Sequence, residues 1–404
     1  MPLERQQVER HRLRILMVLE SPFPIFGGGG AESQVRTLAC ELKRIGHRVT
    51  ILTPRFAEGP QRVVERCFGI PVCRLPYPRV RGLGSLVLWS RLLALLWRRR
   101  RRYDAWHVHI AHYLGAICCA LGRRLDVPVV VKISGQWELG SGLLVDGGGL
   151  GVRMARHLLK SASVYQAISR RIGSELVARG MPAERIVALP NAVDVRRFGV
   201  SQKAPRLQRP LTAVYVGRLQ QHKGLDTLLS GWARAFAARA DVHLLLVGRG
   251  EDESKLRAQA AQLGITDQVQ FLGHRDDVEL VLANADFALL PSLIEGLSNS
   301  LLEFMASGLA VVATRVSGSE DLIVPGRNGW LFPVGDVDAL ALCLREVAAM
   351  PEEKLIEMGR FARRDVEAAA GLESVVARLL SLYRGASPST PGLAFNAAPI
   401  GQGR

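Results

Sequence analysis

Apolar runs and segments with helical periodicity alternate along the chain. The apolar run Arg14 to Leu19 is followed by a Gly-rich turn and by a helical pattern over Ala31 to Ile45, and Val49 to Thr53 forms the next strand-like run. This alternation predicts a largely parallel α/β domain that ends near Pro190. Its further strands are expected within residues 105–110, 127–133, 163–168 and 185–190.

The alternation begins again after a polar stretch, residues 191–210, which contains two prolines and has no period, as is typical of a linker. Strands at Thr212–Val216, Val242–Val247, Val269–Leu272, Phe287–Leu290 and Ala310–Ala313 predict a second α/β domain. We therefore expect an N-terminal domain over residues 1–195, a linker over 196–210, a second domain over 211–365, a C-terminal helix over 366–385 that packs back toward the first domain, and a disordered tail over 386–404.

Composition supports two domains and adds an asymmetry of charge. The 404 residues exceed one ordinary core, and 48% hydrophobic with 22% charged residues is typical of a globular enzyme. The net charge is +16. Residues 1–205 hold 33 basic and 14 acidic residues, so the rest of the chain has a net charge of −3. The basic half is expected to attract a polyanion, an anionic lipid or a phosphorylated ligand.

Several classes of protein are disfavoured because the sequence lacks the motifs that they require. The six cysteines form no C-x-x-C pair, which disfavours a zinc site or a disulfide framework and favours a reducing compartment. The charged N-terminus lacks the apolar region of a signal peptide. The longest apolar stretch, Leu83 to Trp97, is interrupted by Arg91 and is shorter than the roughly 20 residues of a membrane span. We expect a cytoplasmic location.

The most informative segment is Asp286 to Thr314, a buried strand, a polar loop, a short helix and another buried strand. Ser298 is predicted to cap a helix over residues 299–306, whose first N–H groups would face an anion. Glu303 lies one turn inside that helix and can reach hydroxyls beyond a phosphate, and Glu295 faces the same cavity from the loop. The alternative is that both glutamates are a capping partner and a solvated charge.

Two further loops follow predicted strands. Arg218 and Lys223 provide two cations that suit a diphosphate, although loop cations are usually only solvated. Gly248 and Gly250 follow the next strand, but Glu253 replaces the third glycine of G-x-G-x-x-G, so a dehydrogenase fingerprint is not met.

The N-terminal domain offers a Gly-rich loop and a group of polar residues. Gly27 to Gly30 can approach a ligand closely or serve as a flexible connector. No carboxylate or cysteine completes a zinc site with the histidines, and Ser300 stands where a hydrolase elbow needs its second glycine. The polar residues near the expected strand ends are His107, His109, His112, Lys132, Ser134 and Gly135.

Taken together, these motifs resemble the retaining glycosyltransferases of family 4 over about residues 13–385. The most specific element is Glu-x7-Glu, present as EGLSNSLLE from Glu295 to Glu303 and followed by FMASGLAVVAT. PNAVD, VGRLQQHKG, LLLVGRGE and NGWLFPVGD occur in the family's order. The resemblance implies an α/β fold of GT-B architecture, with two Rossmann-like, doubly wound domains facing each other across a cleft.

The resemblance also implies a reaction: transfer of a hexose from a nucleoside diphosphate sugar to an acceptor hydroxyl, with retention at the anomeric carbon and with no metal or other cofactor. The catalytic residues would be Glu295, Arg218 and Lys223: Arg218 and Lys223 would bind the diphosphate, and Glu295 the transferred sugar. Glu303 would bind the ribose. Other donor-binding residues would be Gly28, Gly29, Gly30, Gly217, Gly248, Gly250, Gly296, Leu297, Ser298, Asn299, Ser300 and Leu301.

One position departs from the family pattern. Many members have a histidine that contacts the donor sugar where this chain has Ser134. His109, Lys132 or Ser134 would take over part of its role. Because of Ser134, a catalytically silent nucleotide-sugar binding protein stays open as an alternative to the transferase. A second alternative is another enzyme of the same architecture, a GT-B sugar-nucleotide epimerase.

The basic half points toward the acceptor. The segment Arg79 to Arg102 combines leucines and Trp97 with flanking arginines, as an interfacial element does; the alternative is a core helix with a charged end. We expect a peripheral contact with an anionic membrane face and a lipid-linked or glycan acceptor, in polysaccharide, glycolipid or cell-envelope glycan synthesis. Nucleic acid is not expected as a partner, because no aromatic-rich basic motif is present.

Overall fold

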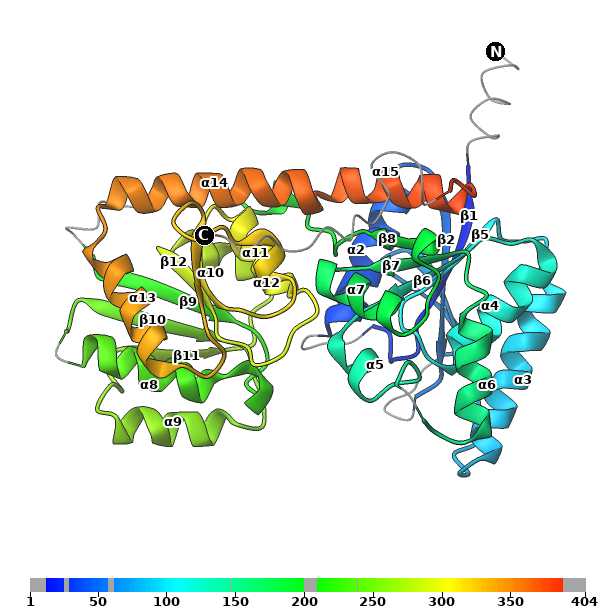
Figure 1. Cartoon of the computed structure of the whole chain (residues 1–404), viewed down its shortest axis with the longest axis horizontal. Helices are drawn as coiled ribbons and strands as arrows, with labels where there is room; N and C mark the ends of the chain where they lie inside the picture. The colour runs from blue at the N-terminus through cyan, green and yellow to red at the C-terminus, as the bar shows by residue number, and fades with distance from the viewer. Residues whose placement is uncertain are drawn as a thin grey trace, which may run out of the picture. The chain divides into compact units, whose positions relative to one another are not determined.

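The computed structural model of the chain describes residues 12–24, 29–56, 62–145, 147–199, 209–237 and 239–387. These residues form two compact units, and Figure 1 labels many of their helices and strands. The first unit comprises Met1–Asn191 together with Glu373–Arg404, and the second comprises Ala192–Leu372. Each unit is described by itself.

The first unit is built on an eight-stranded sheet with the order β3-β4-β2-β1-β5-β6-β7-β8. Neighbouring described strands are parallel except β3 and β4, which form an antiparallel hairpin. β5, β6 and β7 are buried along their whole length, as strands covered on both faces are. The strands are β1 (Arg14–Val18), β2 (Arg48–Pro54), β3 (Val64–Cys67), β4 (Ile70–Leu75), β5 (Ala105–Val108), β6 (Val129–Ile133), β7 (Val164–Ala167) and β8 (Ile186–Ala188).

Helices alternate with these strands. α4 packs against both α3 and α6. From Glu373 onward the last helix belongs to the first unit, where the Tyr383 hydroxyl lies 2.6 Å from Nδ1 of His107 in the interior. The helices are α2 (Gly30–Arg44), α3 (Leu83–Arg98), α4 (Tyr113–Leu125), α5 (Gln136–Gly140), α6 (Leu150–Leu159), α7 (Arg170–Ala178) and α15 (Leu372–Tyr383), with a 3-10 turn η1 (Ala183–Arg185).

The second unit has a six-stranded parallel sheet with the order β11-β10-β9-β12-β13-β14. This is the doubly wound order, in which the chain reverses its direction of winding between β9 and β12. Ligands of such sheets bind at the carboxyl ends of the strands at that reversal. The strands are β9 (Leu211–Val216), β10 (Val242–Val247), β11 (Val269–Gly273), β12 (Phe287–Leu290), β13 (Ala310–Thr314) and β14 (Gly329–Phe332).

The second unit's helices pack in pairs: α8 on α13, and α11 on α14 (Figure 1). Trp232 of α8 is fully buried and donates its indole N–H to Gln268, so the core hides no unpaired group at this position. The helices are α8 (Leu225–Phe236), α9 (Glu253–Gln262), α10 (Val278–Ala283), α11 (Asn299–Ala306), α12 (Ser319–Leu322), α13 (Val337–Ala349) and α14 (Glu352–Ala370), with 3-10 turns η2 (Val195–Arg197) and η4 (Gln221–Lys223).

The predicted α/β class and the parallel strands are confirmed, and strand bounds agree within one or two residues. β3, β4 and β14 were not predicted as strands. Within the stretch predicted as a linker, the described residues 196–199 include the end of η2, which is tied to the second unit because the Arg363 guanidinium donates to the carbonyl oxygens of Val195 and Phe198. The predicted tail lies outside the described residues from 388 onward.

Candidate functional site

A mostly buried ion pair joins the two loops at the reversal point of the second sheet. Nζ of Lys223, in η4 after β9, lies 2.5 Å from Oε1 of Glu295, in the loop after β12. The hydroxyl of Ser292 donates to the same carboxylate oxygen at 3.0 Å. The two charged side chains are only 17% and 13% exposed. The structure thus brings together two of the three residues predicted to be catalytic.

Close backbone packing holds these two loops against each other. The amide of Leu293 donates to the carbonyl of His222 at 2.9 Å. Gly224, the N-cap residue before α8, has φ +65°, and a Cβ there would lie 2.1 Å from the carbonyl oxygen of Pro291. Only glycine tolerates both the left-handed backbone and this approach. The position of Lys223 is therefore fixed by its neighbour in sequence.

Positive charge dominates the loop after β9. Burial lowers the pKa of His222, and the charges of Lys223 and then Arg218 lower it further. Arg218 itself is exposed, and its carbonyl oxygen accepts a hydrogen bond from the hydroxyl of Tyr215 at 3.0 Å. The two cations that flank His222 disfavour its protonated form, so the positive charge that an anionic ligand would meet in this loop comes from Lys223 and Arg218.

α11 begins four residues after Glu295 and covers the residues predicted for it, Asn299–Ala306. One detail of the prediction was wrong: Ser298 is the N-cap residue, but its side chain makes no capping hydrogen bond to any described residue. Glu303 lies half-buried one turn inside the helix. The backbone at Gly318 (φ +81°) packs closely against the turn before α11, because a Cβ at Gly318 would lie 2.7 Å from the carbonyl oxygen of Gly296.

Three glycines predicted to bind the donor pack the loops after β9 and β10 together. A Cβ at Gly248 would lie 1.9 Å from the carbonyl oxygen of Gly217, and one at Gly250 would lie 2.0 Å from that of Leu219. A Cβ at Gly217 would meet the hydroxyl of Tyr215 at 2.5 Å. These close contacts explain why glycine is needed at the three positions without any contact to a ligand.

The remaining predicted donor-binding residues lie around α11. Leu297 and Leu301 are buried, so their side chains anchor the segment and only their backbone could face a ligand. Ser298, Asn299 and Ser300 are half-buried.

The first sheet has its own reversal point, between β1 and β5, and two carboxylates lie beside it. Glu20, after β1, contacts Nδ1 of His112 at 2.8 Å and accepts the amide of Leu114 at 3.1 Å, at the start of α4. Glu138 of α5 is fully buried and accepts the amides of Ala111 at 2.8 Å and Ser134 at 2.6 Å. Sequence reasoning missed both glutamates, although Glu20 follows a strand end in the same way as Arg218 does.

Of the three residues proposed to replace the family's histidine, only Ser134 is accessible. His109 is fully buried and stacks on His107 with ring centroids 4.1 Å apart, and burial holds its pKa well below the ordinary value. Burial also lowers the pKa of Lys132 to about 7. Ser134 is half-buried and its hydroxyl donates to the carbonyl of His109. His109 and Lys132 therefore support the sheet from inside, and we do not assign them a substrate contact.

The Gly-rich loop is described only in part. Gly28 lies outside the described residues, Gly29 is the N-cap of α2 and Gly30 is its first residue. The carboxylate of Glu32, bonded to the hydroxyl of Ser21, lies 1.9 Å from where a Cβ of Gly29 would stand. The positive end of α2 thus already has a carboxylate of its own beside it.

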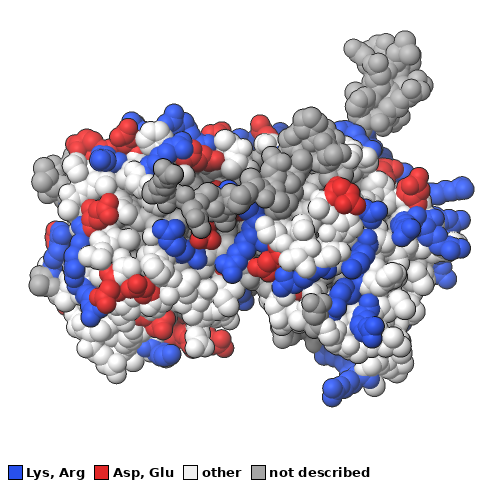
Figure 2. Space-filling model, in the orientation of Figure 1, with Lys and Arg blue, Asp and Glu red and all other residues white. Residues whose placement is uncertain are grey.

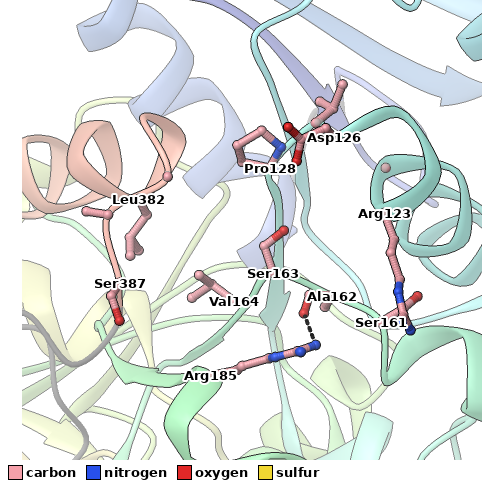
Figure 3. Close-up of a pocket in the computed structure, with 14 residues that line it drawn as sticks. Arg123, Asp126, Pro128, Ser161, Ala162, Ser163, Val164, Arg185, Leu382 and Ser387 are labelled. Atoms are coloured by element: carbon pink, nitrogen blue, oxygen red, sulfur yellow. Dashed lines mark hydrogen bonds between the residues drawn. The ribbon is translucent and has the colours of Figure 1, made fainter.

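A pocket of about 430 Å³ in the first unit lies elsewhere (Figure 3). Pro128 and Ser163, which line it, precede β6 and β7, so the pocket opens at the amino ends of the strands. Arg185 crosses it and donates to the carbonyl of Ala162 at 3.1 Å. Because ligands of doubly wound sheets bind at the carboxyl ends, we assign this pocket no part in the candidate site.

Comparison with known proteins decides the family. Residues 210–349 match the family described as glycosyl transferases group 1, and residues 29–192 match the glycosyl transferase 4-like domain. The chain is a GT-B glycosyltransferase of family 4. No helix within the described ranges combines the length and the apolar character that crossing a membrane requires.

Relatives of this glycosyltransferase come from several pathways. It is 31% identical to the GDP-mannose-dependent alpha-mannosyltransferase of Mycobacterium tuberculosis, over 81% of this chain and 85% of that one. It is 30% identical to the phosphatidyl-myo-inositol mannosyltransferase of Mycolicibacterium smegmatis, over 82% and 84%. The match to the putative colanic acid biosynthesis glycosyltransferase WcaL of Salmonella typhimurium, also 30% identical, spans 57% of this chain and 58% of the relative.

Solved structures show the same fold. Anabaena HepE in complex with UDP superposes with a TM-score of 0.72 at 21% identity, over 91% of this glycosyltransferase and 98% of HepE. Sucrose-phosphate synthase from Thermosynechococcus elongatus has a TM-score of 0.75 at 21% identity, over 92% and 98%.

Proposed function

We propose that this glycosyltransferase moves a hexose from a nucleoside diphosphate sugar to an acceptor hydroxyl, with retention at the anomeric carbon and without a metal ion. The observation that carries the proposal is the Lys223–Glu295 pair at the reversal point between β9 and β12. That point is where doubly wound sheets bind nucleotides. The mannosyltransferase relative that uses GDP-mannose and the structural neighbour with UDP support a nucleotide donor.

Lys223 and Arg218 would hold the diphosphate. An ammonium group has three N–H donors, and the bond to Glu295 uses one of them, which leaves two for phosphate oxygens. Glu295 also fixes the direction of the ammonium group before the donor arrives. The exposed guanidinium of Arg218 supplies a forked donor from the same loop.

The start of α11 would meet the distal phosphate through backbone amides. Because the Ser298 side chain caps no described amide, a phosphate can take the place of the usual cap. Glu303, one turn inside, would accept hydrogen bonds from the ribose hydroxyls. Negative charge grows on the diphosphate as the glycosidic bond breaks, and these fixed positive groups stabilise it in the transition state.

The acceptor side is proposed from the first unit. Relatives named for colanic acid synthesis and for phosphatidyl-myo-inositol support a glycan or lipid-linked acceptor. Ser134 and the loop amides that Glu138 ties together lie at the carboxyl edge of the first sheet, where the transferred sugar would be expected.

A donor panel tests the proposal. UDP, GDP and ADP sugars are screened for thermal stabilisation and for slow hydrolysis, and a true donor raises the melting temperature and releases a nucleoside diphosphate. An epimerase would release none in the presence of acceptors, and a silent binding protein would be stabilised without turnover. The anomeric proton coupling of the product reports retention or inversion. Loss of turnover on adding EDTA would contradict metal independence.

A further inference from the structure

α3 has apolar side chains on two opposite faces. Gly84, Leu88, Leu92 and Leu96 recur every four residues and are buried against the first unit. A second set recurs at intervals of three, seven and four residues, which places it on one face of a helix of 3.6 residues per turn. This second set, named here the outer stripe, is Leu83, Leu86, Leu93 and Trp97, with exposed fractions of 52%, 60%, 48% and 46%.

A core helix needs only the buried face. Large exposed apolar side chains elsewhere in the described residues are more scattered. In the second unit Leu280 and Leu342 lie on different helices, and in the first unit α6 has two, Leu150 and Met154. Four exposed apolar side chains on one face of a single helix need another explanation.

Arginines surround the outer stripe. Arg98 ends the helix, Arg99 to Arg102 follow it, Arg79 and Arg81 precede it, and residues 66–103 contain no Asp or Glu. The Arg100 guanidinium lies 5.1 Å from the ring centre of Trp97, so charge and apolar surface meet at the helix end. Figure 2 shows Lys and Arg side chains gathered at the edge of the first unit where α3 and α4 lie in Figure 1.

We propose that the outer stripe of α3 and the arginines at its end form a docking surface for an anionic lipid membrane. Leucine and tryptophan side chains enter the boundary between headgroups and acyl chains, and arginines bind lipid phosphates while their aliphatic stems stay in apolar surroundings. The sixteen-residue helix lies along the surface, because its other face stays buried in the protein. Charge complementarity favours this occupant over a second copy of the chain, which would bring its own arginines.

The docking surface goes beyond the proposed function, since it requires no donor and no turnover. Flotation with vesicles tests it directly. The full chain is mixed with vesicles of phosphatidylcholine alone or of equal parts phosphatidylcholine and phosphatidylglycerol. We expect flotation with the anionic vesicles only, and loss of it in about 1 M salt, where the Debye length falls to about 3 Å.

Variants separate the two parts of the surface. Leu86→Ser, Leu93→Ser and Trp97→Ser together should reduce partitioning at least about ten-fold, because their partial burial in lipid is lost. Arg100→Gln with Arg101→Gln and Arg102→Gln should abolish the preference for anionic vesicles. Leu342→Ser, equally exposed on α13, is the matched control and should float as the parent does. Melting temperatures confirm that each variant is folded; if the triple variant is not, Leu86→Ser alone should still weaken partitioning about three-fold.

Three outcomes would overturn the proposal. Equal flotation with neutral and anionic vesicles would remove the charge argument, and unchanged flotation of the folded stripe variants would remove the apolar one. A stripe variant that instead dissociates a dimer in sedimentation, with no vesicle binding by the parent, would show that the stripe joins two copies of the chain.

Discussion

The ammonium group of Lys223 and the carboxylate of Glu295 lie 2.5 Å apart although 72 residues separate them in the chain. Each stands just after a central strand of the second sheet, on either side of the point where the winding reverses. A mostly buried ion pair costs desolvation and is weak evidence for a purely stabilising role. Its position favours a role in binding a charged ligand, with Glu295 as the residue that orients Lys223.

Replacing Lys223 by alanine should lower kcat about 10²-fold, because one preorganised group that meets the leaving diphosphate is lost. Steady-state kinetics with the donor found in the panel measures this. Lys255→Ala, an exposed lysine on α9, is the control and should keep parental activity.

A double-mutant cycle tests whether Glu295 acts through Lys223. Glu295→Gln should reduce activity strongly in the parent and much less when Lys223 is already alanine, since residues in direct contact are not additive. Full activity of Lys223→Ala, or strictly additive losses, would contradict the assigned roles.

Glu303→Ala should raise the donor KM about ten-fold with a smaller change in kcat. The carboxylate is expected to bind the ribose in the ground state and in the transition state alike, and one hydrogen bond to a charged group is worth about 1.5–3 kcal/mol. Titration with the free nucleoside diphosphate checks the same loss without turnover. Glu346→Ala, an exposed glutamate on α13, should change neither value; an unaltered affinity in Glu303→Ala would remove the ribose assignment.

Gly224→Ala and Gly264→Ala form a matched pair, because their φ values are +65° and +68°. The left-handed backbone penalises both alanines by roughly 1–2 kcal/mol. Of the two positions, only at 224 does the new Cβ meet a backbone oxygen, that of Pro291 at 2.1 Å, whereas no atom of the described residues lies within 4 Å of it at position 264. Gly224→Ala should therefore be about 1–3 kcal/mol less stable than Gly264→Ala and should lose activity as well. Urea unfolding and steady-state kinetics of the two variants measure this difference. Equal stability and activity would mean that the loops do not depend on the close contact between Gly224 and Pro291.

Periodicity in the sequence predicted the helices and most strands. It could not predict contacts between loops that are far apart in the chain. The bounds of α11 followed from its apolar pattern and from the glycine after it, and both predicted cations lie on one loop. The Lys223–Glu295 contact could not be predicted, because it depends on the order of strands in the sheet. The hairpin of β3 and β4 was missed because its turn places Phe68 and Gly69 at φ +53° and +71°. Such turns are usually recognised by Asn-Gly or Asp-Gly.

The charge asymmetry of the sequence has a structural counterpart in part. The arginines that follow α3 contribute to the basic excess of residues 1–205, whereas the candidate donor site in the second unit has two cations and two glutamates. Binding at the candidate donor site would therefore depend on a few well-positioned side chains. Attraction of an anionic partner to the first unit would depend on its large net positive charge.

The stability of the protein should depend on pH through Glu138. Burial raises the pKa of this carboxyl group from 4.5 to about 7, although backbone amides of Ala111 and Ser134 oppose the change. Between pH 4.5 and 7 the unfolded chain releases the proton while the folded chain keeps it, so the free energy of unfolding falls as pH rises. A shift of this size corresponds to at most about 3 kcal/mol.

Glu138→Gln removes this titration and keeps a side chain of the same size. Urea unfolding at several pH values between 4.5 and 7 should show the parent losing stability relative to Glu138→Gln as pH rises, and the difference between the two curves cancels the titration of other groups such as His112. Lys132, whose pKa burial lowers to about 7, is charged in both states over most of this range, so its own proton release belongs to higher pH. Glu346→Gln is the exposed control and should run parallel to the parent. Parallel curves for Glu138→Gln would instead show that Glu138 is already ionised in the folded protein, with Lys132 as the charge that stabilises it.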